Sequence, residues 1–267
     1  MTTDWNDDLQ LALAIADAAD TVTMSRFLAA DLAVETKADT SPVTEADKAC
    51  EETIRSMLAT ERPDDGLLGE EFGTADTDAQ RRWIIDPIDG TKNYLRGVPV
   101  WCTLIALEDR GELVVGVASA PALGRRWWAA RGQGAHTCDV DGSVRPLHVS
   151  SVNTLADASF SFSDEEYWDV RGATAGLRTL IEDTWRARAY GDFLSHVFVA
   201  EGAVDIAAEP ALAPWDMAAL VPIVEESGGT ITAFDGTAAL TGHCAVSTNG
   251  HLHEVALRVL RPTPASE

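Results

Sequence analysis

Apolar side chains recur every three to four residues along the first thirty positions of the chain. Leu9, Ile15 and Val22 belong to this series. The spacing matches the period of an α-helix that buries one face, so it predicts a long first helix over residues 5–30.

A second helix is predicted by its start signal. Thr44 is followed three residues later by Asp47. This arrangement resembles a capping box, in which each side chain bonds the backbone N–H of the other residue. We expect the helix to end before Pro63, because proline cannot continue a helical hydrogen-bond pattern. The preceding residues 31–43 are predicted to be extended or loop, and 66–71 form a short apolar run that ends in acid.

The middle of the chain contains short runs of aromatic and β-branched residues, which are typical of strands. Trp83–Ile85 is predicted to be a buried strand. Further strands are predicted over 100–107, 113–120 and 126–130. The first two of these are joined by Asp109-Arg110-Gly111, which is typical of a hairpin turn.

Helices and strands alternate in the second half of the chain. Helices are predicted over 170–183, 192–202, 215–227 and 251–260, and strands over 184–190, 203–208, 230–234 and 244–247. Residues 74–82 are predicted to be a polar loop and 131–150 a glycine-rich irregular segment. Gly228-Gly229 is a suitable end for the helix over 215–227.

This order of elements predicts an α/β chain of the α+β type, with stacked layers of sheet and helix. We expect antiparallel pairing in the first half. No linker-like composition interrupts the chain. We therefore expect one domain over 1–267, with an N-terminal half of about 1–150 and a C-terminal half of about 151–267.

Composition narrows the class of protein. Hydrophobic residues make up 46% and charged residues 24% of the 267 positions, which is ordinary for a globular protein. No apolar run approaches the about 20 residues that span a bilayer, and the N-terminus lacks the features of a signal peptide. The chain has four scattered cysteines without the paired spacing of a disulfide framework or a zinc site, namely Cys50, Cys102, Cys138 and Cys244. This favours a reducing compartment and a structural role for each of them. These features predict a cytoplasmic protein.

The net charge of −23 excludes some partners. A surface this acidic repels nucleic acid and anionic membranes, so neither is predicted to bind. It also repels phosphate, so an acidic protein that handles phosphate needs a local positive charge, such as bound Mg²⁺. The simpler interpretation is that the charge serves solubility alone.

The strongest chemical signal is Asp86-Pro87-Ile88-Asp89-Gly90, at the end of the predicted strand. We expect both carboxylates just beyond that strand, with Pro87 restricting the backbone between them. If a helical turn begins at Gly90, its free N–H groups point toward whatever the carboxylates hold. Asp86, Asp89 and the carbonyl of Ile88 offer only oxygen ligands, which favour Mg²⁺ or Mn²⁺ over zinc.

The same segment has other possible interpretations. An isolated turn with two solvated acids would have the same sequence. An EF-hand loop would need acids at Ile85 and Pro87, and neither is one. An aspartyl-phosphate nucleophile would be expected in the pattern Asp-x-Asp-x-Thr, whereas this chain has Asp-x-x-Asp-Gly-Thr.

Three further short sequence motifs lie before and after segment 83–91. They are Pro42–Asp47, Gly69–Glu71, and Pro214–Ala219 with the following Glu226–Gly229. Together the four elements resemble the inositol monophosphatase superfamily of Mg²⁺-dependent phosphatases, over essentially the whole chain. The resemblance implies the layered αβαβα sandwich of that superfamily and a homodimer.

The resemblance also implies a set of metal ligands. Glu70, Asp86 and the Ile88 carbonyl would bind one Mg²⁺, and Asp86, Asp89 and Asp216 a second. A third, weaker Mg²⁺ would lie near Glu70, and Mn²⁺ is an alternative metal. The sites would thus hold two to three ions.

The implied catalytic residues are Glu70, Asp47 and Thr91. Thr91 and Asp47 would hydrogen-bond to each other and help to orient the attacking water. The amides of Gly90 and Thr91 would face the phosphate. The residues implied around the phosphate are Asp89, Gly90, Thr91 and Asp216.

Arg188, Asp192 and Glu209 are implied on the side of the leaving alcohol. Two carboxylates suit an ammonium group better than a polyol, because they form charge-assisted hydrogen bonds with it. Asp192 has an alternative role as the N-cap of the helix over 192–202. The six histidines have no ligand-like spacing and are interpreted as structural or surface residues.

Segments 125–132 and 190–193 also resemble the histidinol-phosphate phosphatases of actinobacteria. We therefore predict a Mg²⁺-dependent phosphomonoesterase that hydrolyses L-histidinol phosphate in histidine biosynthesis. One alternative is an inositol-1-monophosphatase or a broad-specificity sugar-phosphate phosphatase. Another is a non-catalytic binding or regulatory protein, which the complete set of implied ligands disfavours. The predicted partners are a small phosphate monoester and a second copy of the chain.

Overall fold

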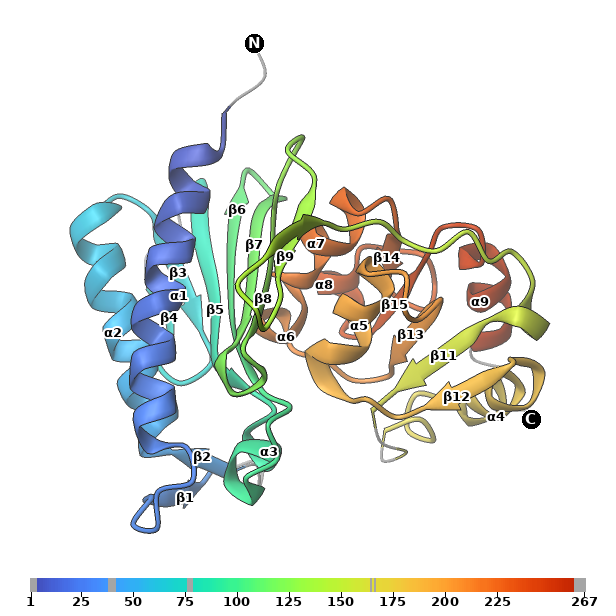
Figure 1. Cartoon of the computed structure of the whole chain (residues 1–267), viewed down its shortest axis with the longest axis horizontal. Helices are drawn as coiled ribbons and strands as arrows, with labels where there is room; N and C mark the ends of the chain where they lie inside the picture. Colours follow the sequence, from blue (N-terminus) through green and yellow to red (C-terminus); the bar gives the residue numbers. More distant parts are fainter. Residues whose placement is uncertain (1–3, 38–41, 76–78, 164, 166, 262–267) are drawn as a thin grey trace.

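The computed structural model describes residues 4–37, 42–75, 79–163, 165 and 167–261, and Figure 1 shows their arrangement. Helices and sheets alternate as five layers along the long axis of the molecule (Figure 1). Among the described residues, none of the helices combines the length and apolar character that crossing a lipid bilayer requires.

The first layer consists of two helices that pack on each other, α1 (Asn6–Arg26) and α2 (Glu45–Glu61). The predicted capping box of α2 is confirmed, since Thr44 and Asp47 each bond the other's backbone N–H. The first helix ends earlier than predicted, because the chain turns at Leu28, which has a φ of 64°. Between the helices, β1 (Val34–Thr36) pairs with β2 (Pro42–Thr44). The predicted extended segment thus holds two short strands, although its residues 38–41 lie outside the described part.

The second layer is an eight-stranded sheet in the order β10-β9-β8-β7-β6-β5-β3-β4. Its strands are β3 (Gly66–Gly69), β4 (Gly73–Ala75), β5 (Arg81–Asp89), β6 (Cys102–Asp109), β7 (Glu112–Ala120), β8 (Arg125–Ala130), β9 (Ala135–Cys138) and β10 (Val144–Pro146). All neighbours pair antiparallel except β3 and β5. The predicted meander and its hairpin turn at 109–111 are confirmed.

Two predictions in this sheet are wrong. Residues 131–150 are not irregular, because β9 and β10 extend the sheet beyond β8 and glycines occupy the turns. Strand β5 does not stop at Ile85, so Asp86 and Asp89 lie within its last part. The strand continues because Asp86 is paired with Leu104 and Asp89 with Cys102 of β6, with an irregularity between the two pairs. Pro87 lies in that irregularity, where its missing N–H breaks no ladder bond.

A second, five-stranded sheet has the order β12-β11-β13-β15-β14. Its strands are β11 (Ser159–Phe162), β12 (Arg186–Arg188), β13 (Ile206–Glu209), β14 (Thr230–Thr232) and β15 (Ala245–Thr248). Strand β11 was not predicted, whereas the other four fall within predicted strands or within one residue of them.

Further α-helices connect or follow these strands along the chain. They are α3 (Thr91–Arg96), α4 (Thr174–Asp183), α5 (Asp192–Ala200), α6 (Pro214–Met217), α7 (Leu220–Glu226), α8 (Ala239–Gly242) and α9 (His253–Leu260). The single helix predicted over 215–227 is two helices. The break at Ala218 has a local cause, because Pro222 has no N–H to donate to the carbonyl four residues earlier.

Helices α5, α6 and α7 lie between the two sheets, and α4 and α9 cover the outer face of the second sheet (Figure 1). One apolar cluster fills the space between the first sheet and α5 to α7, a second lies under α1 and α2, and a third lies under α4 and α9. The predicted α/β class with its αβαβα layering is confirmed. The division into a single domain with two halves stays a prediction.

Candidate metal and phosphate site

The last residues of β5 turn sharply into α3. Gly90 has a φ of 85°, in the left-handed region that favours glycine. A Cβ added there would lie 3.0 Å from the carbonyl oxygen of Val100. The backbone N–H of Ile88 donates to Asp86 Oδ1 at 2.9 Å. Glycine and this local bond therefore hold the acidic strand end and the start of α3 in one compact turn.

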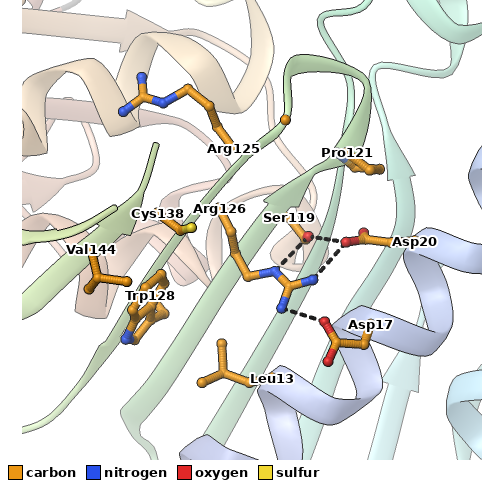
Figure 2. A pocket seen from close by; sticks show the side chains of 11 residues that line it. Leu13, Asp17, Asp20, Ser119, Pro121, Arg125, Arg126, Trp128, Cys138 and Val144 are labelled. Atoms are coloured by element: carbon orange, nitrogen blue, oxygen red, sulfur yellow. Dashed lines mark hydrogen bonds and ion pairs between the residues drawn. The ribbon is translucent and has the colours of Figure 1, made fainter. Parts of the chain in front are cut away.

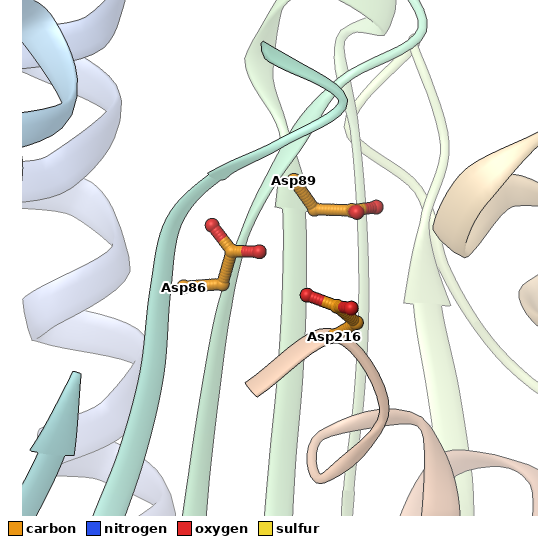
Figure 3. A group of neighbouring side chains, drawn as sticks. All are labelled: Asp86, Asp89 and Asp216. Carbon is orange, nitrogen blue, oxygen red and sulfur yellow. The ribbon is translucent and has the colours of Figure 1, made fainter. Parts of the chain in front are cut away.

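Three aspartates converge at this strand end, as Figure 3 shows. Asp86 and Asp89 come from β5, and Asp216 comes from α6 of the neighbouring layer. One carboxylate oxygen of each lies within 4.8 Å of the other two. Asp89 Oδ2 accepts a hydrogen bond of 3.0 Å from the backbone N–H of Phe193, and Asp216 Oδ2 accepts one of 2.7 Å from Ala213.

The electrostatics of this cluster are unfavourable without a cation. Burial, followed by repulsion from neighbouring carboxylates, raises the pKa of Asp86 and of Asp89 well above the usual value. Burial also raises the pKa of Asp216 to about 7, against the hydrogen bond from Ala213. Like charges held together out of water disfavour ionisation. An oxygen-only donor set of this kind fits a hard divalent cation, so the cluster could hold a metal ion.

Glu70 comes directly after β3, the strand that pairs with β5, and it lines the same cavity as the three aspartates. Lys37 Nζ donates to Glu70 Oε1 at 2.6 Å and to Glu71 Oε1 at 2.7 Å. Burial alone would lower the pKa of Lys37, but these bonds outweigh it and raise that pKa. Glu51 of α2 holds the turn after Glu70, because its carboxylate accepts the backbone N–H groups of Glu71 and Phe72.

Asp47 and Thr91 meet beside the acidic cluster. Thr91 Oγ1 lies 3.4 Å from Asp47 Oδ1 and 3.1 Å from the carbonyl oxygen of Ile88. Burial raises the pKa of Asp47 to about 6, although the bonds from Thr44 oppose this shift. The hydroxyl of Thr91 is therefore anchored by two acceptors near the strand end.

These residues open into a cavity of about 210 Å³. It is lined by Glu70, Asp86, Ile88, Asp89, Gly90, Thr91, Ser163, Tyr167, Asp192, Glu209, Pro210, Ala211, Leu212 and Asp216. An adjoining hollow of about 480 Å³ shares six of these residues, among them Gly90 and Asp192. Ser163 and Tyr167 were not predicted, and no local sequence signal distinguishes them.

Of the three residues expected beside the leaving alcohol, two line the cavity and one does not. Glu209 is buried at the end of β13, and Asp192 begins α5; both line the cavity. Arg188 does not line it among the described residues, because its side chain is exposed and donates to the neighbouring carbonyl of Ala187. The interpretation of Asp192 as an N-cap is wrong. Gly191 occupies that position, and Asp192 Oδ2 instead accepts a bond of 3.0 Å from Asn93 Nδ2.

A separate cavity of about 470 Å³ lies between α1 and strands β7 to β10, and Figure 2 shows its lining. Arg126 of β8 is its central charged group (Figure 2). The guanidinium contacts Asp17 at 2.8 Å and Asp20 at 2.6 Å, and its Nε donates to Ser119. The carboxylates of this cavity thus face a cation supplied by the chain itself.

Comparisons with known proteins agree with this architecture. The pattern described as the inositol monophosphatase family matches residues 4–264. A histidinol-phosphatase of Streptomyces coelicolor is 55% identical over 261 residues, covering 96% of this chain and 98% of the relative. A histidinol-phosphatase of Mycobacterium tuberculosis is 56% identical, covering 94% and 97%.

More distant relatives and solved structures agree. An inositol-1-monophosphatase of Rhizobium meliloti is 34% identical, covering 88% of this chain and 89% of the relative. The crystal structure of the suhB protein of Bartonella henselae has a TM-score of 0.87 at 29% identity, covering 95% of this chain and 98% of that one. The resemblance inferred from the four sequence elements is confirmed, and the chain belongs to the inositol monophosphatase family.

Proposed function

We propose that this protein is a metal-dependent phosphomonoesterase that hydrolyses L-histidinol phosphate to L-histidinol and phosphate, as a step of histidine biosynthesis. Two relatives above 50% identity over nearly the whole chain bear the name histidinol-phosphatase. The observation that carries the proposal is a single cavity with an acidic cluster at one end and two further carboxylates, Asp192 and Glu209, in its wall.

The acidic end would hold two to three Mg²⁺ ions, with Mn²⁺ as a substitute. The expected ligands are Glu70, Asp86, the Ile88 carbonyl, Asp89 and Asp216. Support comes from the convergence of three of these carboxylates and from the raised pKa of each, which a cation would reverse. When bound, the metal would lower the pKa of a coordinated water and neutralise charge on the phosphoryl group.

The surrounding residues would orient the reacting groups. Thr91 and Asp47 are within reach of each other, and Asp47 is held from its other side by Thr44. This anchoring suits a role in directing the attacking water, because a fixed hydroxyl loses little entropy in the reaction. The backbone N–H groups of Gly90 and Thr91, at the start of α3, would bind phosphate oxygens.

Substrate choice would rest on the leaving alcohol. A ligand with a primary amine near the phosphate ester could meet Asp192 and Glu209 through charge-assisted hydrogen bonds. A neutral polyol would leave the buried carboxylate of Glu209 without a matching charge, which costs binding energy. Arg188 is not expected to contact the substrate, because its side chain is not part of the described cavity lining.

Steady-state kinetics on the full-length protein test this proposal. With Mg²⁺ present, kcat/KM for L-histidinol phosphate should exceed that for inositol 1-phosphate by about 100-fold or more, since an unpaired buried charge costs several kcal/mol. Chelation with EDTA should abolish phosphate release from both substrates, and added Mg²⁺ should restore it.

The reverse preference would reject histidinol phosphate in favour of an inositol or sugar phosphate on the same scaffold. Absence of phosphate release from either substrate would support a non-catalytic role. We also propose that the protein is a cytoplasmic homodimer. Trp185, 70% exposed beside the edge strand β12, offers an apolar surface for such contact.

A further inference from the structure

His196 is buried directly behind one wall of the acidic cavity. It lies on α5, with 1% of its surface exposed, and faces Glu209 at the end of β13. Its Nε2 lies 3.7 Å from Glu209 Oε1. Neither of these two buried atoms has a hydrogen-bond partner among the described residues. A buried polar atom without a partner is costly, so this pairing calls for an explanation.

The surroundings of the two ring nitrogens together favour one neutral tautomer. His196 Nδ1 lies 2.7 Å from Ser247 Oγ on β15. If Nδ1 carried the proton, the lone pair of Nε2 would face the carboxylate, and two acceptors would oppose each other. If the Ser247 hydroxyl donates to Nδ1, the proton lies on Nε2 and points to Glu209. The second arrangement places a donor opposite the carboxylate, so that no acceptor faces an acceptor.

We propose that His196 is a positioning residue that holds the Glu209 carboxylate toward the leaving alcohol of the substrate. The separation of 3.7 Å is longer than a hydrogen bond. Such contacts in ligand-free sites are often long and shorten in the substrate complex. A donor on Nε2 would fix the direction of the Glu209 carboxylate, which suits recognition of an ammonium group of the substrate.

This inference rests on the proposed function in one respect, namely that Glu209 contacts the leaving alcohol. It adds a residue that does not touch the substrate. Ser247, His196 and Glu209 form a line from the second sheet to the cavity wall, so the orientation of Glu209 is set by the packing of α5 on that sheet. We therefore expect His196 to act on substrate affinity rather than on the chemical step.

Two substitutions of His196 separate positioning from a merely structural role. In His196→Asn the amide can replace Nδ1 toward Ser247 but cannot reach Glu209. In His196→Gln the amide nitrogen can occupy the place of Nε2. We expect His196→Asn to raise KM for L-histidinol phosphate about ten-fold, with kcat changed less than about three-fold, because one donor to a buried charge is lost. His196→Gln should recover most of that affinity. Equal losses in both variants, or a loss in kcat alone, would overturn the proposal.

A double-mutant cycle with Glu209→Gln tests whether His196 acts through Glu209. If it does, His196→Asn should have little further effect on KM in the Glu209→Gln background. Additive effects would contradict the inference. The cycle uses whichever phosphate ester the wild-type protein hydrolyses best. A wild type that rejects L-histidinol phosphate therefore refutes the substrate assignment, while the cycle still decides the role of His196.

A measurement on the unaltered protein avoids any dependence on the folding of variants. The ¹⁵N chemical shifts of the imidazole distinguish the two neutral tautomers. We expect the signal of His196 to show a protonated Nε2 and an unprotonated Nδ1 at neutral pH. The opposite tautomer would leave Glu209 without its donor and would refute the proposal.

Discussion

Carboxylates line the cavity between α1 and β8 and the cavity at the end of β5, and the two cavities differ in what faces those carboxylates. Between α1 and β8, Asp17 and Asp20 contact the guanidinium of Arg126 (Figure 2). At the end of β5, three aspartates face one another instead (Figure 3). The first group is neutralised by the chain itself, whereas the second requires a cation from solution.

The difference is also visible in the causes of the pKa shifts. Arg126 opposes the effect of burial on Asp20, although burial still raises the pKa of that carboxyl. Burial raises the pKa of Asp86 as well, but here repulsion from the surrounding carboxylates raises that pKa further. An acidic cluster thus indicates a ligand site only when no cationic side chain of the protein faces it. Buried carboxylates without a counter-charge lower the stability of the fold, so their presence calls for a ligand.

The largest expected effect is on catalysis. Asp89→Asn removes one charge from the metal cluster but keeps an acceptor for the N–H of Phe193. We expect Mg²⁺-dependent phosphate release to fall about 10³-fold or more, since preorganised electrostatic groups carry effects of this size. The circular dichroism spectrum should stay native. Activity near that of the wild type would exclude Asp89 as a ligand.

The matched control is Asp20→Asn in the other cavity, where a comparable carboxylate is removed. It should retain phosphatase activity, because Asp20 pairs with Arg126 and lies outside the proposed site. A large loss in this variant would mean that activity responds to any buried carboxylate, and the contrast between the two cavities would fail.

A smaller effect is expected on thermal stability. At about 100 times its dissociation constant, Mg²⁺ should add about 2.7 kcal/mol to the free energy of unfolding. A chain of this size should then gain about 2–4 °C in Tm for each kcal/mol. Differential scanning calorimetry with and without Mg²⁺ measures this gain. Asp89→Asn should abolish most of it.

Arg126→Met is the control for the calorimetric experiment. Removing the guanidinium leaves Asp20 partly buried without its counter-charge, so Tm should fall both with and without Mg²⁺. The gain caused by Mg²⁺ should stay the same as in the wild type. A reduced gain would indicate that the two cavities are coupled.

The smallest expected effect is the pH dependence of the metal-free protein. The pKa of Asp216 is raised to about 7 and that of Asp47 to about 6, so the folded state binds protons that the unfolded state has released. The free energy of unfolding should therefore fall as the pH rises from about 4 to about 7. We expect a modest slope, because neighbouring acids share their protons.

Urea denaturation in EDTA at pH values across that interval measures the slope. Mg²⁺ should oppose it, because metal binding requires deprotonated ligands and strengthens as the pH rises. Asp216→Asn should flatten the metal-free slope. Unchanged slopes in Mg²⁺ and in Asp216→Asn would show that other carboxylates govern the dependence.

Local patterns predicted much of the fold. The capping box at Thr44, the meander from Trp83 to Ala130 and the turn at Gly90 each depend on a few neighbouring residues, and these were identified correctly. Two of the errors arose where distant partners override local preference. The glycine-rich stretch forms β9 and β10 because β8 offers an edge to pair with. Strand β5 passes Ile85 because β6 continues beside it.

The sequence by itself determined the chemistry of the site. Asp86, Ile88 and Asp89 lie within four positions, and oxygen ligands at that spacing indicate a hard cation wherever the chain is folded. The order of such short motifs along the chain also indicated the family. Each motif consists of a few adjacent residues, so it can be recognised without knowledge of the fold.

Beyond the residues that the family resemblance implied, only the tertiary structure decided which distant groups meet this segment. Lys37 reaches Glu70 across 33 positions, and Phe193 donates to Asp89 across 104. The same packing directs Arg188 away from the cavity and sets His196 behind Glu209. The contact of Phe193 with Asp89 and the position of His196 depend on how α5 lies between the two sheets. Residue spacing cannot encode that packing, because many long-range contacts determine it together.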